Sequence, residues 1–220
     1  MKRSSFLLLL FYPAFIYAQA NYSWYEPAWV NGVSVLDSSN IYHRLPAHIQ
    51  SQVRKPVWDL STNTAGLFIC FKTTARNISV RILLGAKQLA FPHMPQLGVS
   101  GVDLYAVDKN GAWNWAPANF NFGDTATFQY KNIQLAGNGA TDFYLYLPLY
   151  NTVQWLSIGV PQNEKVEFVK ENRDKPIVAY GTSILQGAVA SRAGLAWSNI
   201  LGRRLDRTII NLGFSGNGRL

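Results

Sequence analysis

From about residue 30 to residue 160, hydrophobic positions come in short β-branched and aromatic runs separated by Gly, Asn, Asp and Pro. Alternation of apolar and polar side chains, typical of strands with one buried face, is clearest at 79–82 and 142–147. Runs at this spacing, without a helical period between them, predict an all-β, jelly-roll-like sandwich. The predicted strands are 66–71, 78–84, 102–107, 125–135, 143–147 and 153–160.

A hairpin turn is predicted directly after one of these strands. In the stretch 108–111, Asn110-Gly111 favours the positive φ angles of a type I′ turn. We therefore expect the chain to fold back on itself after the strand at 102–107.

The chain changes character after residue 160. Residues 161–176 contain Pro, Asn and a charged run, which is typical of a domain junction. Apolar strands are predicted at 176–181 and 208–212, with a helix between them. The order strand, loop, helix, strand predicts one βαβ unit of a parallel sheet. The apolar residues at helical spacing are Trp197, Ile200, Leu201 and Leu205.

These patterns divide the chain into a leader at 1–20, a β-sandwich domain at 21–163 and an α/β segment at 164–220. A parallel sheet must be covered on both faces, and the roughly 55 residues after the junction are too few for that. We therefore expect 164–220 to be the N-terminal fragment of a larger α/β domain, incomplete in the given sequence.

The leader has the three parts of a secretory signal peptide. Lys2 and Arg3 form a positive start, residues 6–16 form an apolar stretch, and 18–20 is a small-x-small cleavage pattern. A permanent membrane anchor is the weaker alternative, because the stretch is short for a bilayer core of about 30 Å and contains Pro13. We expect a secreted or periplasmic protein that is soluble once the leader is removed.

Composition excludes several classes of protein. Hydrophobic residues make up 48% of the chain and charged residues 15%, which is typical of a globular protein rather than a disordered one. The net charge is +8, but the basic residues are scattered, so we expect no nucleic-acid partner. Cys70 is the single cysteine and lies in an apolar run, which excludes a disulfide scaffold and favours a buried, inert thiol.

Ser183 is the candidate for chemistry. It follows the strand at 176–181, and ligands of open α/β sheets bind beyond the carboxyl ends of the strands. The second strand ends in the glycine-rich loop 213–218, which in a parallel sheet opens at the same edge. The amides of Ser183 and Gly216 can therefore point at one oxyanion, as acyl transfer requires.

Other interpretations of this segment compete with catalysis. A Gly-x-Ser sequence alone is common in turns and helix caps. Leu185 departs from the Gly-x-Ser-x-Gly elbow of the α/β-hydrolases, which disfavours that fold. The glycines of 213–218 also lack the spacing of a dinucleotide-binding fingerprint.

Taken together, the motifs resemble those of the SGNH hydrolases, also called GDSL-type esterases. Residues 181–184, Gly-Thr-Ser-Ile, are similar to the family's Gly-Asp-Ser-Leu block, with Thr182 in place of Asp. Residues 211–217, Asn-Leu-Gly-Phe-Ser-Gly-Asn, are similar to its second block. Upstream, Pro-His-Met at 92–94 and Gly-Val-Asp-Leu-Tyr at 101–105 resemble the signature of the GxDLY domain, an all-β module found in front of some secreted bacterial members.

The resemblance implies a three-layer α/β/α hydrolase domain without cofactor or metal. It implies that Ser183 is the acyl nucleophile and that its amide and that of Gly216 are two of the three oxyanion-hole donors. The family's third donor is an Asn side chain, and its base is a His in an Asp-x-x-His tail. Neither block is present in this sequence. Ser183 would therefore lack its proton acceptor, and a serine of ordinary pKa is a poor nucleophile.

Three other residues remain candidates for contacts with substrate or between domains. His93 could replace the missing base, with Asp103 orienting it, although both are better explained as loop and strand residues at the domain interface. Asn217 follows Gly216 and could contact substrate. His43, His48 and His93 lack the spacing of metal ligands.

Two functions follow from these patterns. The first is the N-terminal portion of a secreted serine esterase that hydrolyses small acyl esters, including acetyl esters of carbohydrate, and that is inactive as this fragment. An acyltransferase is an alternative within the same family. The second is a secreted carbohydrate-binding or interaction module without catalysis. Trp113 and Trp115 could stack on sugar rings, although core packing explains most tryptophans.

Overall fold

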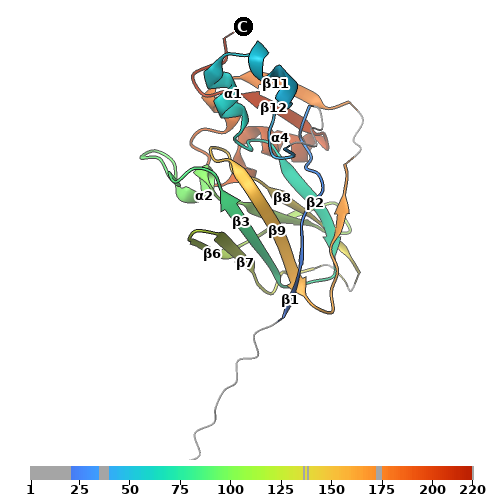
Figure 1. Ribbon diagram of the computed structural model, residues 1–220. Coiled ribbons are helices and arrows are strands. Elements are labelled where there is room, and N and C mark those ends of the chain that lie inside the picture. The colour runs from blue at the N-terminus through green and yellow to red at the C-terminus, as the bar shows by residue number, and fades with distance from the viewer. Residues whose placement is uncertain (1–20, 35–39, 136, 138, 172–174, 220) are drawn as a thin grey trace, which may run out of the picture.

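A computed structural model describes residues 21–34, 40–135, 137, 139–171 and 175–219 (Figure 1). The predicted signal peptide lies outside the described residues. Two five-stranded antiparallel sheets form a β-sandwich. The first has the order β1 (Tyr22–Tyr25), β9 (Val153–Pro161), β3 (Ile78–Leu84), β7 (Ala126–Tyr130), β6 (Ala118–Phe122). The second has the order β10 (Glu167–Val169), β2 (Phe68–Thr73), β8 (Thr141–Tyr146), β4 (Asp103–Val107), β5 (Trp113–Ala116).

The predicted sandwich is confirmed, whereas its jelly-roll connectivity stays a prediction. The strand expected at 78–84 coincides with β3, and the strand expected at 125–135 ends at Tyr130. Strand β10 pairs with β2, so part of the predicted junction lies in the sandwich sheet. The sequence pattern missed β1, β5, β6 and β10, all of which lie at or next to sheet edges, where alternation of apolar and polar side chains is weakest.

The expectation of no helix before residue 160 is wrong. The 3₁₀ helix η1 (Ala47–Gln52) and the helix α1 (Lys55–Ser61) lie between β1 and β2, and α2 (Gln96–Val99) precedes β4. α1 has a proline in its first turn, where the missing amide costs nothing. These helices are too short to show a 3.6-residue hydrophobic period, which is why the sequence pattern did not reveal them.

The hairpin between β4 and β5 is present, but its predicted type I′ turn is wrong. Gly111 has φ +79°, whereas Asn110 is not among the residues with positive φ. The Asp108 carboxylate accepts hydrogen bonds from the amides of Asn110 and Ala112, at 2.8 and 2.9 Å. The side chain of Asp108 therefore closes a loop in which only the glycine is left-handed.

The α/β segment contains a parallel pair of strands. β11 (Ile177–Gly181) leads through α3 (Ser183–Gln186), the 3₁₀ helix η2 (Ala193–Leu195) and α4 (Trp197–Leu205) to β12 (Ile209–Gly213). β11 and β12 pair in parallel, with Ile177 opposite Ile209 and Gly181 opposite Gly213. The predicted order of strand, helix and parallel strand is therefore present.

Helix α4 lies where apolar spacing predicted it, but it buries another face. Its buried residues are Ser198, Asn199 and Gly202, whereas Trp197 and Leu205 are 44% and 50% exposed. A Cβ atom on Gly202 would lie 3.0 Å from the Arg207 carbonyl oxygen. Small side chains therefore let the helix approach the rest of the segment closely.

Two hydrophobic cores meet at the second sheet. One fills the sandwich and includes Leu67, Phe71 and Phe128. The other joins the outer face of the second sheet to the α/β segment and includes Phe68 and Tyr146. Cys70 belongs to this outer core and is buried, as predicted. Because both faces of the second sheet are covered there, consecutive residues of β2 and β4, at 68–71 and 103–106, are all buried.

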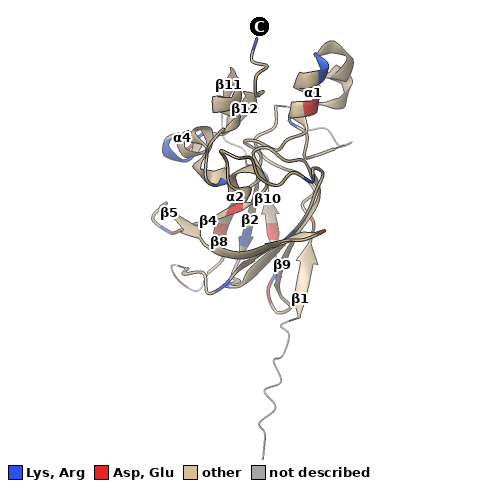
Figure 2. Ribbon diagram, turned by 90° about the vertical axis from the view of Figure 1, so that its left-hand side faces the viewer, with Lys and Arg blue, Asp and Glu red and all other residues tan. Residues whose placement is uncertain are grey.

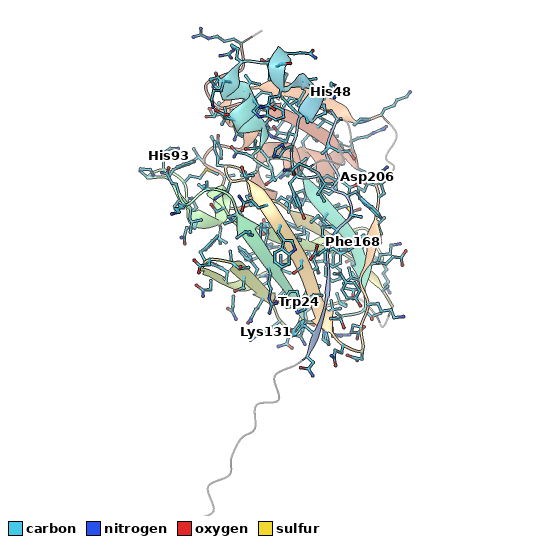
Figure 3. The ribbon with its side chains drawn as sticks, in the orientation of Figure 1. Trp24, His48, His93, Lys131, Phe168 and Asp206 are labelled. Carbon is cyan, nitrogen blue, oxygen red and sulfur yellow. The ribbon has the colours of Figure 1, made fainter. Side chains whose placement is uncertain are left out.

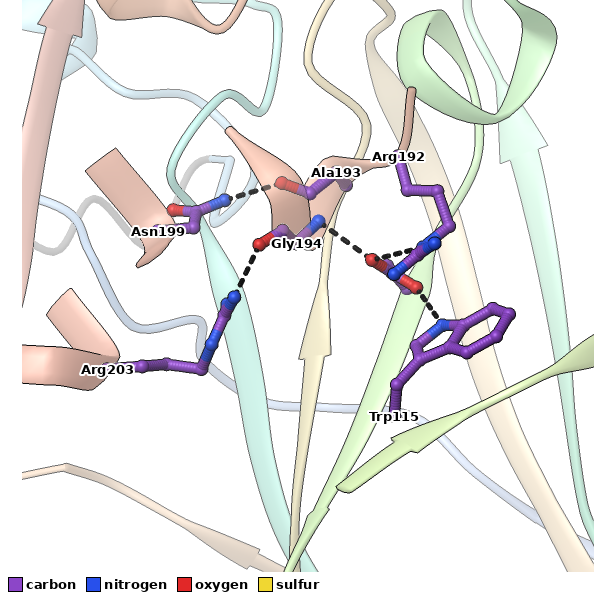
Figure 4. A network of polar contacts seen from close by, with 7 residues as sticks. Trp115, Arg192, Ala193, Gly194, Asn199 and Arg203 are labelled. Atoms are coloured by element: carbon purple, nitrogen blue, oxygen red, sulfur yellow. Dashed lines mark hydrogen bonds and ion pairs between the residues drawn. The ribbon is translucent and has the colours of Figure 1, made fainter. Parts of the chain in front are cut away.

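A buried carboxylate joins the sandwich to the α/β segment (Figure 4). Asp103 on β4 accepts hydrogen bonds from Trp115 Nε1 at 2.7 Å, Gly194 N at 3.0 Å and Arg192 Nε at 3.2 Å. Burial raises the pKa of Asp103, and the Arg192 guanidinium and the two other donors oppose that rise. A Cβ atom on Gly194 would lie 2.4 Å from the Tyr105 ring and 2.6 Å from Asp103 Oδ2, so the segment docks too closely for any side chain there.

Charged groups are distributed over the fold. Lys and Arg lie on α1, on α4 and on strands of the sandwich (Figure 2). Within the described ranges, no helix combines the length and hydropathy that crossing a bilayer would need.

We predict that replacing Asp103 destabilises the protein far more than replacing an exposed acid. Asp103→Ala leaves the partly buried Arg192 and two other donors without their acceptor, which should lower the free energy of unfolding by about 3 kcal/mol. Asp142→Ala removes the exposed ion pair with Lys72 and should cost less than about 1 kcal/mol. Urea unfolding of both variants measures the difference, and equal losses would contradict a structural role for the Asp103 network.

Candidate active site at the ends of the parallel strands

The loops that follow β11 and β12 interlock. The Phe214 amide donates to the Gly181 carbonyl at 2.9 Å, and the Ser215 amide donates to Gln186 Oε1 at 2.9 Å. These bonds join the two strand-end loops directly. The predicted Ser183 and Gly216 loops therefore lie together at one edge of the parallel pair, near the C-terminal end of the described chain (Figure 1).

Two glycines permit the close approach of these loops. A Cβ atom on Gly213 would lie 2.3 Å from the Gln186 amide nitrogen. A Cβ atom on Gly218 would lie 2.6 Å from the Gly181 carbonyl carbon and 2.6 Å from Thr182 Cγ2. Both neighbours are fixed in the opposite loop, so neither position accommodates a side chain.

Ser183 is the first residue of α3 and is half-buried. Its carbonyl accepts hydrogen bonds from the Gly187 amide at 3.1 Å and from the Tyr150 hydroxyl at 3.2 Å. In the part of the chain that the structure describes, the amides of Ser183 and Gly216 donate to no protein group. Gly216 is exposed, with φ +69°. Two adjoining loops thus each present an unused backbone donor, which is the type of group that stabilises an oxyanion.

Tyr150 extends from the sandwich to both loops. Its hydroxyl donates to the Ser183 carbonyl. Burial raises the pKa of Tyr150, while a hydrogen bond with Ser215 and the charge of Arg44 oppose the rise. The phenol is therefore neutral at pH 7, and its function at this site is to position backbone.

Gln186 is completely buried and holds the loops to the sandwich. Its Nε2 donates to the Leu149 carbonyl and to Asn63 Oδ1, both at 3.2 Å, while its Oε1 accepts from the Ser215 amide. The two Nε2 bonds fix the loop after β11 to the sandwich, and the Oε1 bond fixes the loop after β12 to the loop after β11.

Asn211 provides a second link, from β12. Its Nδ2 donates to the Leu185 carbonyl at 2.7 Å and to Ser198 Oγ at 3.1 Å, and its Oδ1 accepts from the Gly213 amide at 2.9 Å. Asn211 lies within the second block, for which the sequence predicts roles only at Gly216 and Asn217.

Arg44 is a site residue that the sequence pattern did not reveal. It is 2% exposed, and its guanidinium donates to carbonyls on both sides of the domain junction. The bonds to Leu60 and Asn63 are 2.7 and 2.8 Å long, and those to Asn211 and Gly213 are 3.1 and 2.7 Å long. Its only sequence signal was a charged residue inside the apolar stretch 41–46.

The Arg44 guanidinium is charged at pH 7. Burial lowers its pKa to about 9. It also lies over the Phe214 ring, 4.8 Å from the ring centroid. A fixed positive charge therefore lies directly behind the glycine-rich loop.

Asn217 contacts another arginine, Arg54, which directly precedes α1. Arg54 Nη1 donates to Asn217 Oδ1 at 3.0 Å, and Arg54 Nη2 donates to the Asn217 carbonyl at 3.3 Å. The Asn217 amide group donates to the Ser215 carbonyl at 2.9 Å. The side chain that we considered for substrate contact thus stabilises its own loop, and Arg54 lies at the rim of the site.

The structure does not bring a histidine to Ser183. His43 contacts Asn40 and the Trp58 ring, and His93 stacks on Phe91. His48 and His93 lie on separate parts of the surface (Figure 3). Within the described residues, no histidine hydrogen bonds to Ser183.

The hydrogen-bond partners of Asp103 also argue against a catalytic role. They are Trp115, Arg192 and Gly194, and His93 is not among them. In the described ranges, no three His, Cys, Asp or Glu side chains gather as metal ligands would. The arrangement therefore supplies a candidate nucleophile and oxyanion donors, without a proton acceptor.

We predict that Arg44→Lys loosens the loop after β12. One ammonium cannot reach carbonyls on both sides of the junction, so the variant should lose about 2 kcal/mol of stability. Amides in 214–217 should exchange with deuterium about tenfold faster, because opening costs less. Arg81→Lys, on the sandwich surface beside Trp24, is the control and should leave the loop unchanged. Loop protection equal to that of the unmodified protein in Arg44→Lys would contradict the anchoring role.

Comparison with known proteins identifies the family. Residues 21–166 match the GxDLY family model, described as the N-terminus of SGNH hydrolase-type esterases, and residues 174–220 match the GDSL-like lipase/acylhydrolase family. No curated protein matches the chain.

Two solved structures are similar. A proposed GDSL-like lipase from Bacteroides ovatus ATCC 8483 is 31% identical, with a TM-score of 0.82, over 90% of this chain and 58% of its own. The salicylyl-acyltransferase SsfX3 from a tetracycline biosynthetic pathway is 18% identical, with a TM-score of 0.66, over 91% of this chain and 56% of its own. The chain thus spans little more than half of either protein. With the family model covering most of its length, the chain belongs to the SGNH hydrolase family of GDSL-like lipases and esterases, with a GxDLY domain at its N-terminus.

Proposed function

We propose that this chain carries the nucleophile end of a secreted serine esterase that acts on small acyl esters. Ser183 is the nucleophile, and the amides of Ser183 and Gly216 bind the oxyanion. The observation that carries the proposal is the interlocking of the two strand-end loops through the Phe214 and Ser215 amides, which brings both unused donors to one edge. The parallel pair and its helices are, in this proposal, the first βαβ unit of a three-layer α/β/α hydrolase domain.

The proposed reaction passes through an acyl-serine. Ser183 Oγ forms a bond to the acyl carbon, and the carbonyl oxygen takes up negative charge facing the two amides. The bond to the leaving alcohol then breaks, and the alcohol departs with the proton that the Ser183 hydroxyl gave up. Water attacks the acyl-serine in the same way and releases the acid. If another hydroxyl takes the place of water, the same site transfers the acyl group, which is the chemistry named for the similar salicylyl-acyltransferase.

The proposed substrates are neutral esters, including acylated carbohydrate. Arg44 is completely buried and donates four hydrogen bonds to carbonyl groups, and Arg54 is held by Asn217. Neither guanidinium is therefore an open anchor for an anionic acyl group. Export from the cytoplasm is proposed on the leader sequence alone.

We predict that a fluorophosphonate probe labels Ser183, slowly without and faster with added imidazole. Imidazole supplies the proton acceptor that the site lacks, and since general bases contribute 10²–10⁴-fold, a gain of at least about tenfold is expected. Mass spectrometry of proteolytic peptides locates the label. Ser183→Ala should abolish it, whereas Ser191→Ala, which changes an exposed serine of the same segment, should not. Equal labelling of several serines, or none at Ser183 with imidazole present, would refute the assignment.

We also predict that the 220-residue chain hydrolyses p-nitrophenyl acetate no faster than its Ser183→Ala variant. A serine without a base keeps its ordinary pKa and reacts slowly. Turnover that disappears in Ser183→Ala would contradict this prediction. His93→Ala would then test whether His93 acts as the base.

A further inference from the structure

Two hollows adjoin Trp115 on the sandwich, and neither is lined by the loops of Ser183 and Gly216. Trp115 is 45% exposed. Trp113, two residues earlier on the same strand face, packs on Tyr144 with ring centroids 4.4 Å apart. Packing therefore accounts for Trp113, whereas Trp115 stays 45% exposed although the Arg192 guanidinium lies over its ring, 4.0 Å from the ring centroid.

The smaller hollow is an aromatic cleft of about 170 Å³. Trp115 and Phe120, each 45% exposed, line it together with the buried Phe128. An engineered cavity of about 150 Å³ holds benzene, so this cleft has room for one six-membered ring.

A tyrosine with a buried hydroxyl is among the residues that line the same cleft. Tyr130 is 1% exposed, and among the described residues its hydroxyl has no hydrogen-bond partner. An unsatisfied buried hydroxyl costs about 1–3 kcal/mol. A ligand that carries its own hydroxyl groups can offset this cost where an apolar ligand cannot.

The larger hollow, the polar hollow, has both apolar and polar residues in its lining and a volume of about 550 Å³, which lies in the range of ligand-binding sites. Asn114 and Gln134 each donate one hydrogen bond to a nearby carbonyl, at 3.2 and 3.3 Å. An amide side chain has further donor and acceptor sites for a ligand. The polar side chains that line this hollow are Asp108, Asn114, Lys131, Asn132 and Gln134.

The charges around the two hollows balance. Asp103 and Arg192 form an ion pair at the aromatic cleft, and Asp108 and Lys131 line the polar hollow. The two carboxylates would repel an anionic chain, and the two basic groups would repel a cationic chain. The lining therefore favours a neutral ligand.

We propose that this surface is a binding site for a neutral polysaccharide. One sugar ring packs its apolar face against Trp115 and Phe120 in the aromatic cleft, and neighbouring sugars hydrogen bond to the amide side chains of the polar hollow. This combination of aromatic wall and convergent polar groups suits a ring with apolar faces and hydroxylated edges. The site is separate from the Ser183 loops, and binding does not require catalysis.

Affinity electrophoresis of the full chain tests the proposal. The gels contain soluble xylan, galactomannan or mixed-linkage β-glucan, with polygalacturonate as the anionic comparison. We expect at least one neutral polysaccharide to retard the protein. Trp115→Ala should weaken that binding at least about tenfold, whereas Trp115→Phe, which keeps a ring but loses the bond to Asp103, should retain most of it.

Trp197→Ala is the matched control, because Trp197 is 44% exposed and donates to the Ile184 carbonyl beside Ser183. It should bind as the unmodified protein does. Phe120→Ala provides a second variant of the aromatic cleft if thermal unfolding shows that Trp115→Ala is unstable. The proposal is overturned if no neutral polysaccharide retards the protein, or if Trp115→Ala and Phe120→Ala both keep full affinity. Loss of binding in Trp197→Ala alone would place the ligand at the Ser183 loops and also overturn it.

Discussion

Buried carbonyl groups at the end of β12 require donors, and Arg44 supplies them from the sandwich. One guanidinium donates to the carbonyls of Asn211 and Gly213 on β12. It also donates to the carbonyls of Leu60 and Asn63, at and just after the end of α1. If β12 moved away from the chain around Leu60 and Asn63, carbonyl groups would lose their donor and the guanidinium would lose its partners. Both losses are costly inside a protein. The glycine-rich loop begins at this point. Its position, and with it that of the Gly216 amide, therefore depends on the sandwich as much as on the parallel strands.

The Asp103 network also depends on hydrogen bonds between the sandwich and the α/β segment. The Asp of the GxDLY signature is a buried acceptor for donors from both parts of the chain, and Tyr105 of the same signature packs against Gly194 and beneath the Arg203 guanidinium. Asp103 and Tyr105, two residues of the signature by which the sandwich is recognised, thus also bind it to the α/β segment. A separately folding binding module would not need them, so this contact favours a sandwich that is part of the hydrolase architecture.

Sequence patterns predicted the elements in which apolar side chains recur at a regular spacing. They missed features that depend on partners far away in the sequence. The central strands, the parallel pair and α4 were found because their apolar runs are local. The buried face of α4 was not, because Ser198, Asn199 and Gly202 are buried through contacts that only the tertiary fold supplies. Ser183 and Gly216 were found from loop motifs, whereas Gln186, Tyr150 and Arg44 act through carbonyls and amides far away in sequence. No local pattern marks a residue whose partners lie 167 and 169 positions away.

The site thus separates two requirements of acyl transfer. Placement of the oxyanion donors depends on backbone, glycines and buried polar side chains, and all of these are present and mutually hydrogen bonded in the described chain. Proton transfer depends on a basic side chain beside Ser183, and the histidine rings are engaged elsewhere or lie apart from it. Preorganised donors stabilise charge only after the nucleophile has attacked, so they cannot replace the base that makes the attack feasible. In the proposed reaction, the backbone donors therefore set the geometry of the oxyanion site, and the basic side chain sets the rate of attack.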